Sequence, residues 1–211
     1  MMSSGGSYSL VLAANYRVSD ISGIPAAMEK WRSRLASNGI HHVVFYTSNA
    51  GDERVFVTVG IRQREPVKEL LRSRVIFDWF DDAGIEDLPA VFAGETVEKI
   101  DTRERPTTHA VSGTIVAVMA SVADVSALMD SIHGQLPLLR KSGVNQLWVY
   151  RAFDDEHEVL MLHDVENEEL AQLWIDHPAK VAEWMESTGL GPYPQPFVGS
   201  LAHVFTIEAP G

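Results

Sequence analysis

Cysteine is absent from the chain of 211 residues, and this absence excludes disulfide bonds, thiolate metal sites and cysteine nucleophiles. The sequence also lacks any apolar run near the roughly 18 to 20 residues that a membrane-spanning helix needs. Its first residues, MMSSGGS, have neither the charged region nor the apolar region of a signal peptide. We therefore expect a cytoplasmic protein with no membrane partner.

Positive charge is scarce, because 17 Lys and Arg residues stand against 29 Asp and Glu residues and give a net charge of −12. A surface of this sign repels phosphate backbones, so we expect no nucleic-acid partner. The sequence motifs GxGxxG, GxSxG and the phosphate-binding loop are also missing. Nucleotide chemistry and serine-hydrolase chemistry therefore have no support in the sequence.

The histidines form no recognisable metal-binding pattern, because HExxH and HxH spacings are both absent. His157 and His163 share one face of an expected strand, but six strand residues separate them by roughly 20 Å. His41 and His42 are adjacent, and neighbouring strand residues are expected to point to opposite faces. The sequence therefore predicts no metal site.

What the sequence does contain is an internal repeat. At an offset of 104 positions, Leu35, Gly39, Tyr46 and Val55 match Leu139, Gly143, Tyr150 and Val159. At an offset of 105 positions, Trp79, Gly84, Pro89, Phe92 and Gly94 match Trp184, Gly189, Pro194, Phe197 and Gly199. The polar stretch 101–109 between the two copies is typical of a linker. We therefore predict two tandem units, at 8–101 and 110–208.

Each copy shows the same alternation of strand and helix patterns. Strands are expected at 10–18, 41–48, 54–61 and 95–100, and again at 114–122, 145–153, 158–165 and 200–207. Helices are expected at 21–38 and 125–142, where Pro137 should kink the second one, and from the N-cap Asn167 through Met185. The order βαββαβ predicts an α+β fold of two ferredoxin-like units, each with an antiparallel sheet and both helices on one face.

The face of each sheet that the helices leave open also needs a cover, because apolar residues alternate onto both faces of the strands at 41–48 and 54–61. Two linked copies can stack sheet on sheet within one chain as an α/β barrel. Alternatively, each copy can pair with the matching copy of a second chain in a homodimer. We favour the arrangement within one chain.

Two stretches carry a family resemblance, LAANYRV at the first strand and ELAQLWIDHPAKVAEWM in the second copy. They resemble the dimeric α/β-barrel superfamily and, within it, the antibiotic-biosynthesis monooxygenase-like proteins, which include cofactor-free quinone-forming oxygenases and haem-degrading oxygenases. The resemblance implies that Asn15 is an active-site asparagine and that Trp174 is the family's helix tryptophan. In the haem-degrading branch a histidine ligates iron where this chain has Trp184, so the resemblance implies no cofactor. Haem stays an alternative if His163, His177 or His203 supplies the ligand.

Three histidines are further candidates, each with a structural alternative. His163 is a candidate base beside Asp164, and His203 lies on the last strand with the parity of an interior residue. His177 precedes Pro178 and is equally typical of a helix start. A hydrogen-bonded core histidine is the alternative for the other two.

Aromatic residues are the candidate substrate-binding groups. Trp174 and Trp184 are candidates for an aromatic pocket, although tryptophans at helical spacing are more often core residues. Tyr193 lies in GLGPYPQP, which is expected to form either a stiff lip over a pocket or a plain connection.

The sequence therefore predicts a protein that binds a small apolar or aromatic molecule in a pocket between sheet and helices. The leading hypothesis is a monooxygenase-like enzyme that acts on an aromatic or polyketide-like substrate, with Asn15, His163 and His203 as catalytic candidates. The alternatives are a non-catalytic binding or assembly module and a haem-binding protein. Because polar positions differ between the copies, we expect the site in one half only, and in the second half first.

Overall fold

The computed structural model describes residues 10–18, 20–62, 78, 81–82, 90–103, 113–176, 183, 186 and 196–208. Its strands are β1 (Leu10–Arg17), β2 (Ile40–Ser48), β3 (Arg54–Ile61), β4 (Val91–Asp101), β5 (Thr114–Ser121), β6 (Val144–Ala152), β7 (Glu158–Val165) and β8 (Phe197–Thr206). Its helices are η1 (Ile21–Gly23), α1 (Ile24–Ser37), α4 (Val125–Gly134), α5 (Leu136–Lys141) and α6 (Glu168–Asp176). The prediction of an antiparallel α+β fold is confirmed.

The strands close into one barrel in the order β1-β3-β2-β8-β5-β7-β6-β4, and every neighbouring pair is antiparallel. The order β4-β1-β3-β2 in the first half repeats as β8-β5-β7-β6 in the second half, which is the strand order of a ferredoxin-like unit. Two seams, β2 with β8 and β4 with β6, join the halves. The sheets therefore cover each other within a single chain. The proposed duplication and its boundaries stay a prediction, because the first half's second helix would lie outside the described residues.

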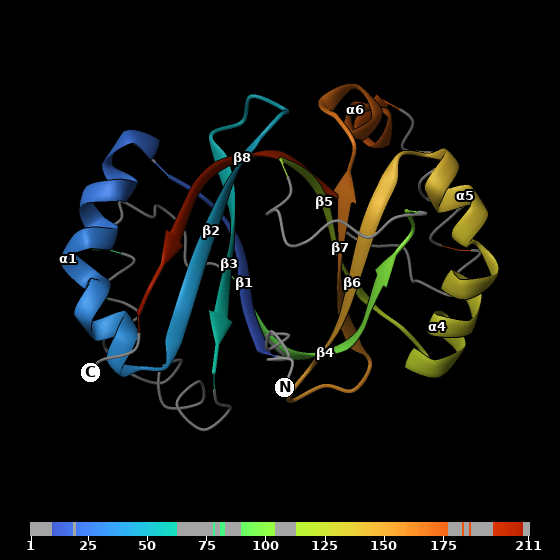
Figure 1. Ribbon diagram of the computed structural model, residues 1–211, viewed down its shortest axis with the longest axis horizontal. Helices are drawn as coiled ribbons and strands as arrows, with labels where there is room; N and C mark the ends of the chain where they lie inside the picture. Colours follow the sequence, from blue (N-terminus) through green and yellow to red (C-terminus); the bar gives the residue numbers. More distant parts are fainter. Residues whose placement is uncertain are drawn as a thin grey trace, which may run out of the picture.

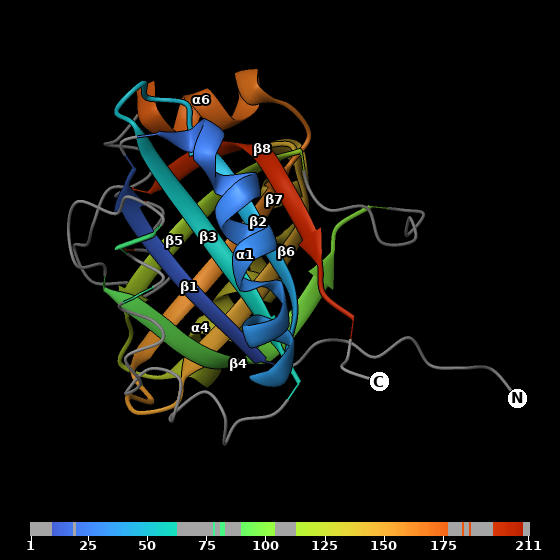
Figure 2. The same cartoon turned by 90° about the vertical axis from the view of Figure 1, so that its left-hand side faces the viewer.

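The barrel lies between α1 on one side and α4 and α5 on the other (Figure 1), and three apolar clusters occupy this arrangement. One core cluster takes residues from all of the strands and fills the barrel, and it includes Val11, Phe56, Ile115 and Phe197. A second cluster lies between the first-half strands and α1, and a third lies between the second-half strands and α4 and α5. Figure 2, viewed from the α1 side, shows that helix lying across the oblique strands β1, β3 and β2.

The helices follow the expected periodicity. The large apolar residues of α1 have the spacing of one helix face, and all of them are buried: Ile24, Met28, Trp31 and Leu35. Gly39 follows the helix in a left-handed conformation with φ of +75°, which favours glycine because it has no Cβ. In the second half the expected helix breaks at Gln135 into α4 and α5, just before Pro137. Proline removes a helical hydrogen bond, so this break is the predicted kink.

The start of the expected linker at 101–109 is part of the barrel instead. Asp101 is the last residue of β4, and its carboxylate accepts hydrogen bonds from Arg103 and from Gln146 of β6. Arg140 of α5 donates to the carbonyl of Thr102. Polar side chains suggested solvent exposure, but these polar groups bond to the second half, and residues 104–109 lie outside the described residues.

The expectation that His41 and His42 point apart is wrong. A register shift of β2 against β3 falls between Ile40 and His42, and such a bulge turns an extra residue out of the normal alternation. The two rings therefore lie together, with their Nδ1 atoms 2.7 Å apart, over Gly60. Among the described residues no group of three or more potential metal ligands is found.

Within the same described part of the chain, the helices are all too short or too polar to cross a bilayer.

Candidate functional site

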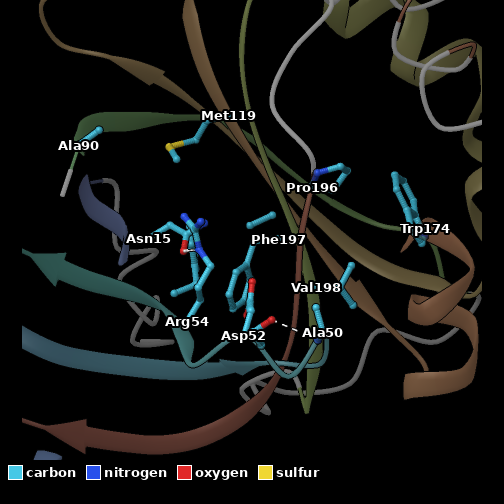
Figure 3. Close-up of a pocket in the computed structure, with 13 residues that line it drawn as sticks. Asn15, Ala50, Asp52, Arg54, Ala90, Met119, Trp174, Pro196, Phe197 and Val198 are labelled. Carbon is cyan, nitrogen blue, oxygen red and sulfur yellow. Dashed lines mark hydrogen bonds between the residues drawn. The ribbon is translucent and has the colours of Figure 1, made fainter. Parts of the chain in front are cut away.

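A pocket of about 450 Å³ opens where the two halves meet. Its lining residues are Asn15, Ser48, Ala50, Asp52, Arg54, Phe56, Ala90, Ala117, Met119, Trp174, Pro196, Phe197 and Val198 (Figure 3). This volume is within the range of roughly 300 to 1,000 Å³ that is typical of small-molecule sites. Both halves supply walls, which differs from the expectation of a site in one half only.

The floor of the pocket belongs to the interior of the barrel. Phe56, Ala117 and Phe197 line the pocket and are members of the cluster that fills the barrel, and Met119 packs against that cluster. Asn15 has the same strand parity as the interior residues of β1. The pocket is therefore the open end of the barrel, rather than a gap between a sheet and its helices as the sequence suggested.

Asn15 and Arg54 form the polar centre of this pocket. Arg54 Nε donates a hydrogen bond of 3.0 Å to Asn15 Oδ1, and Figure 3 shows the two side chains next to each other. The pairing of β1 with β3 explains the contact, because Asn15 lies opposite Phe56 and Arg54 is two residues along the same face. Such diagonal neighbours are within reach of a long side chain. The asparagine thereby fixes the direction of the guanidinium.

Aromatic rings supply the apolar walls. The rings of Phe56 and Phe197 lie 5.4 Å apart and inclined by 30°, and both side chains are buried. Trp174 of α6 reaches the pocket from the helix layer, where it packs against the core of the second half. Apolar walls around a small polar centre are the usual composition of a binding site for an organic molecule.

His163 is outside the lining of this pocket and is a ring neighbour of Trp174. It is fully buried, its Nδ1 donates to the carbonyl of Val116 at 3.2 Å, and its ring centroid is 5.2 Å from that of Trp174. Desolvation lowers the pKa of His163 to about 4, so the ring is neutral at pH 7. Its place on β7 faces the helices and not the barrel, and it does not line the pocket.

Ser200 of β8 links two walls of the pocket. Its hydroxyl donates to Glu168 Oε1 at 2.6 Å and lies 3.0 Å from Asn49 Oδ1. Glu168 begins α6, which carries Trp174, and Asn49 begins the β2–β3 loop, which carries Asp52. Asn167 caps the same helix through the backbone N–H of Leu170 at 2.9 Å, as predicted. The single hydroxyl proton therefore bonds α6 to β8 through Glu168, and the β2–β3 loop lies beside the same hydroxyl through Asn49.

Replacement of Ser200 by Ala is expected to loosen α6 by about 1 kcal/mol, the net value of one such hydrogen bond. Amide hydrogen exchange should show lower protection in α6, while protection in β6 and β7 is unchanged. The matched control is Ser37→Ala, which removes a hydroxyl that bonds only to Arg34 of its own helix. Equal protection of α6 in the wild type and in Ser200→Ala would contradict this role.

The predicted site residues separate into three groups. Asn15 and Trp174 come together in the pocket, although they lie in different halves of the sequence. His163 is a packing neighbour of Trp174, and His203 is half-buried on β8 beside Phe205, with a centroid distance of 5.8 Å and no place in the lining. His177, Trp184 and Tyr193 lie outside the described residues.

Arg54 was missed in the sequence, where it follows the turn NAGDE and has the appearance of a surface hairpin residue. A signal was available, because Arg54 and Phe56 are two residues apart on one strand and therefore point to the same face of the sheet. The direction of that face, however, depends on the register of β1 against β3. Pro196, the last residue of GLGPYPQP, also lines the pocket.

The residues that line this pocket do not fit haem. Haem iron is held by His, Cys, Tyr or Met side chains, and of the described lining residues only Met119 is of such a type. The nearest buried imidazole, His163, uses Nδ1 for the carbonyl of Val116 and faces away from the barrel interior.

No protein-family model matches the chain, and no curated protein matches it in sequence. Solved structures do share its fold. An anthrone oxidase-like protein is 10% identical with a TM-score of 0.67, and the match covers 95% of this chain and 94% of that one. A protein described as a monooxygenase candidate from Lactobacillus acidophilus is 15% identical with a TM-score of 0.54, covering 95% and 98%.

A chlorite dismutase from Candidatus Nitrospira defluvii is 11% identical to this chain with a TM-score of 0.56, covering 94% of this chain and 93% of that chain. At these identities the similarity concerns the fold alone. The chain therefore has the α+β barrel architecture of monooxygenase-like and chlorite dismutase-like proteins.

Proposed function

We propose that the protein binds a planar aromatic molecule in the mouth of its barrel and oxidises it with molecular oxygen. The observation that carries this proposal is that Asn15 and Trp174 line one pocket. These are the two residues that the resemblance to monooxygenase-like proteins singles out, and they come from opposite halves of the chain. Solved structures of anthrone oxidase-like and monooxygenase-like proteins with the same fold support the proposal.

The residues of the pocket would act by binding and by stabilising charge. Phe56, Phe197 and Trp174 would hold the aromatic rings, and the buried walls would keep water from the reacting carbon. Asn15 would orient the oxygen atom of a substrate anion, because a fixed polar group lowers the energy of the charge that develops on that atom. The electrons would come from the substrate: a methylene carbon becomes a carbonyl, one oxygen atom enters the product, and the other leaves as water.

The test is oxygen consumption with a panel of anthrone-type tricyclic ketones, in which the ring methylene is the carbon to be oxidised. The proposal predicts one oxygen molecule consumed for each carbonyl formed, without added cofactor. Asn15→Ala should lower the rate by about tenfold to a hundredfold if the asparagine stabilises the anion, whereas Asn38→Ala, a change at the end of α1 where the amide bonds the carbonyl of Arg34, should keep most of it. Consumption at the uncatalysed rate with every compound of the panel would contradict the enzymatic proposal.

Two other functions remain from the sequence. A non-catalytic binding module would retain aromatic ligands in the same pocket without oxygen consumption. A haem protein would show a Soret band on addition of haemin, and this band would have to disappear in one of His163→Ala, His177→Ala or His203→Ala. The tandem ferredoxin-like origin, a homodimer and a cytoplasmic location also stay predictions.

A further inference from the structure

The strongest unexplained feature of the pocket is the charge of Arg54. An arginine side chain carries five N–H donors and a positive charge, and among the described residues the Nε of Arg54 alone meets an acceptor, Asn15 Oδ1. Among the described residues, no carboxylate oxygen lies within 4.0 Å of this guanidinium. Within the described part of the chain, Arg54 is therefore a half-buried cation that lines a cavity and has no ion-pair partner.

The neighbouring residues fix the orientation of the Arg54 guanidinium. Asn15 orients the guanidinium through Nε, so both terminal nitrogens remain for a molecule in the pocket. Asp52 also lines the pocket, but it lies on the exposed β2–β3 loop, where water screens its charge. Phe56 follows Arg54 on the same face and adds an aromatic wall next to the charge.

The second half of the chain does not repeat this arrangement. At the offset of 104 positions, Asn15 corresponds to Met119 and Arg54 corresponds to Glu158. The protein as a whole has a net charge of −12, so its overall field does not favour anions. Arg54, held by the amide of Asn15, would therefore attract a negative group to the first-half wall of the pocket. The second half has no corresponding cation at this position.

We propose that the pocket selects aromatic anions: a carboxylate, sulfonate or deprotonated hydroxyl on the ring system meets the terminal nitrogens of Arg54, while Asn15 holds the guanidinium. Planar guanidinium groups bind such oxygens through paired, charge-assisted hydrogen bonds. This inference rests on the proposed function only in using the same pocket, because it concerns what binds and not whether it is oxidised.

A pair of fluorescent probes separates charge from shape. Anilinonaphthalene sulfonate carries one negative charge, and N-phenylnaphthylamine has the same arylamine skeleton without it. Titration of the full chain should give tighter binding of the sulfonate. Arg54→Gln should weaken sulfonate binding by about tenfold to a hundredfold, the value of charge-assisted hydrogen bonds, and should change binding of the neutral probe by less than about twofold.

Asn15→Asp is the sharper variant, because it keeps the shape of the side chain and places a carboxylate where Oδ1 accepts the Arg54 hydrogen bond. The new ion pair should neutralise the guanidinium and weaken binding of the sulfonate probe about tenfold. Binding of the neutral probe should be retained. Arg54→Lys should recover part of the affinity that Arg54→Gln loses. Arg32→Gln, which removes the same charge from the surface pair with Glu29 on α1, should leave both affinities as in the wild type.

Each outcome decides a different point. Equal binding of the two probes, or sulfonate binding that survives both Arg54→Gln and Asn15→Asp, would overturn anion selection and leave the proposed pocket standing. Failure of both probes to bind the folded wild type would overturn the pocket as a binding site and the anion proposal with it. Retention of the neutral probe in every variant shows that a loss of sulfonate affinity is not a loss of folding.

Discussion

Gly94→Ala is expected to destabilise the barrel by about 3 kcal/mol, the upper range for overpacking of a rigid site. A Cβ at Gly94 would lie 2.3 Å from the backbone oxygen of Arg151 and 2.7 Å from the ring of Phe92. A backbone carbonyl within the β4–β6 seam cannot move aside without breaking the strand pairing that closes the barrel. Urea unfolding should show a lower midpoint with an unchanged m-value.

The equivalent position on the other seam gives an independent check. A Cβ at Gly199 would lie 2.7 Å from the backbone oxygen of Thr47, so Gly199→Ala should act in the same direction. Gly134→Ala is the control, because no atom lies within 4 Å of its added Cβ at the end of α4. That change should stabilise the protein by about 0.5 kcal/mol through helix propensity. If Gly94→Ala unfolds at the same urea concentration as the wild type, the β4–β6 pairing accommodates the added Cβ and the prediction is wrong.

The second large effect is expected at acidic pH, where the protein should lose stability. The pKa of His163 lies at about 4 in the folded protein, because burial disfavours the charged ring, against 6.5 for an exposed histidine. The unfolded chain therefore binds the proton first as pH falls. The contribution to stability is complete above pH 6.5 and is lost between pH 6.5 and 4, with a total of about 3 kcal/mol for this one ring.

The free energy of unfolding, measured by urea titration from pH 7 to pH 4, should fall less steeply in His163→Asn than in the wild type. The asparagine keeps an N–H donor near the carbonyl of Val116 and removes the titrating ring. Some slope remains in the variant, because desolvation also lowers the pKa of His41 to about 4. Identical slopes in the two proteins would contradict the assignment to His163.

Local pattern was enough to predict most of the fold. The stripe from Ile24 to Leu35, the break before Pro137 and the cap at Asn167 follow from rules that act within one turn of a helix. The contact of His41 with His42 could not be predicted in this way, because it depends on a bulge that arises only when β2 pairs with β3. Register is a property of two strands, and alternation within one strand does not contain it.

The site shows the same limit at a larger distance. Asn15 and Trp174 lie in different halves of the sequence, whereas the site was expected in one half only. They meet because β8, which pairs with β5 in the second half, also pairs with β2 of the first half. Arg54 depends on this topology too, since its charge becomes notable only when β1, β5 and β8 surround it. The sequence shows which residue types are present, but it does not show which of them line the same pocket wall.

One consequence of a pocket with two different walls concerns the direction in which a molecule lies. In a barrel made of two identical chains, each substitution is present twice, and a ligand has two equivalent orientations. Here Arg54 stands on one wall and its counterpart is Glu158. Under the proposed anion selection, a ligand whose two ends differ would therefore have one preferred orientation, with its acidic end toward β3. Under the proposed function, oxygen would then react at a single position of an unsymmetrical substrate, and the products would be one regioisomer.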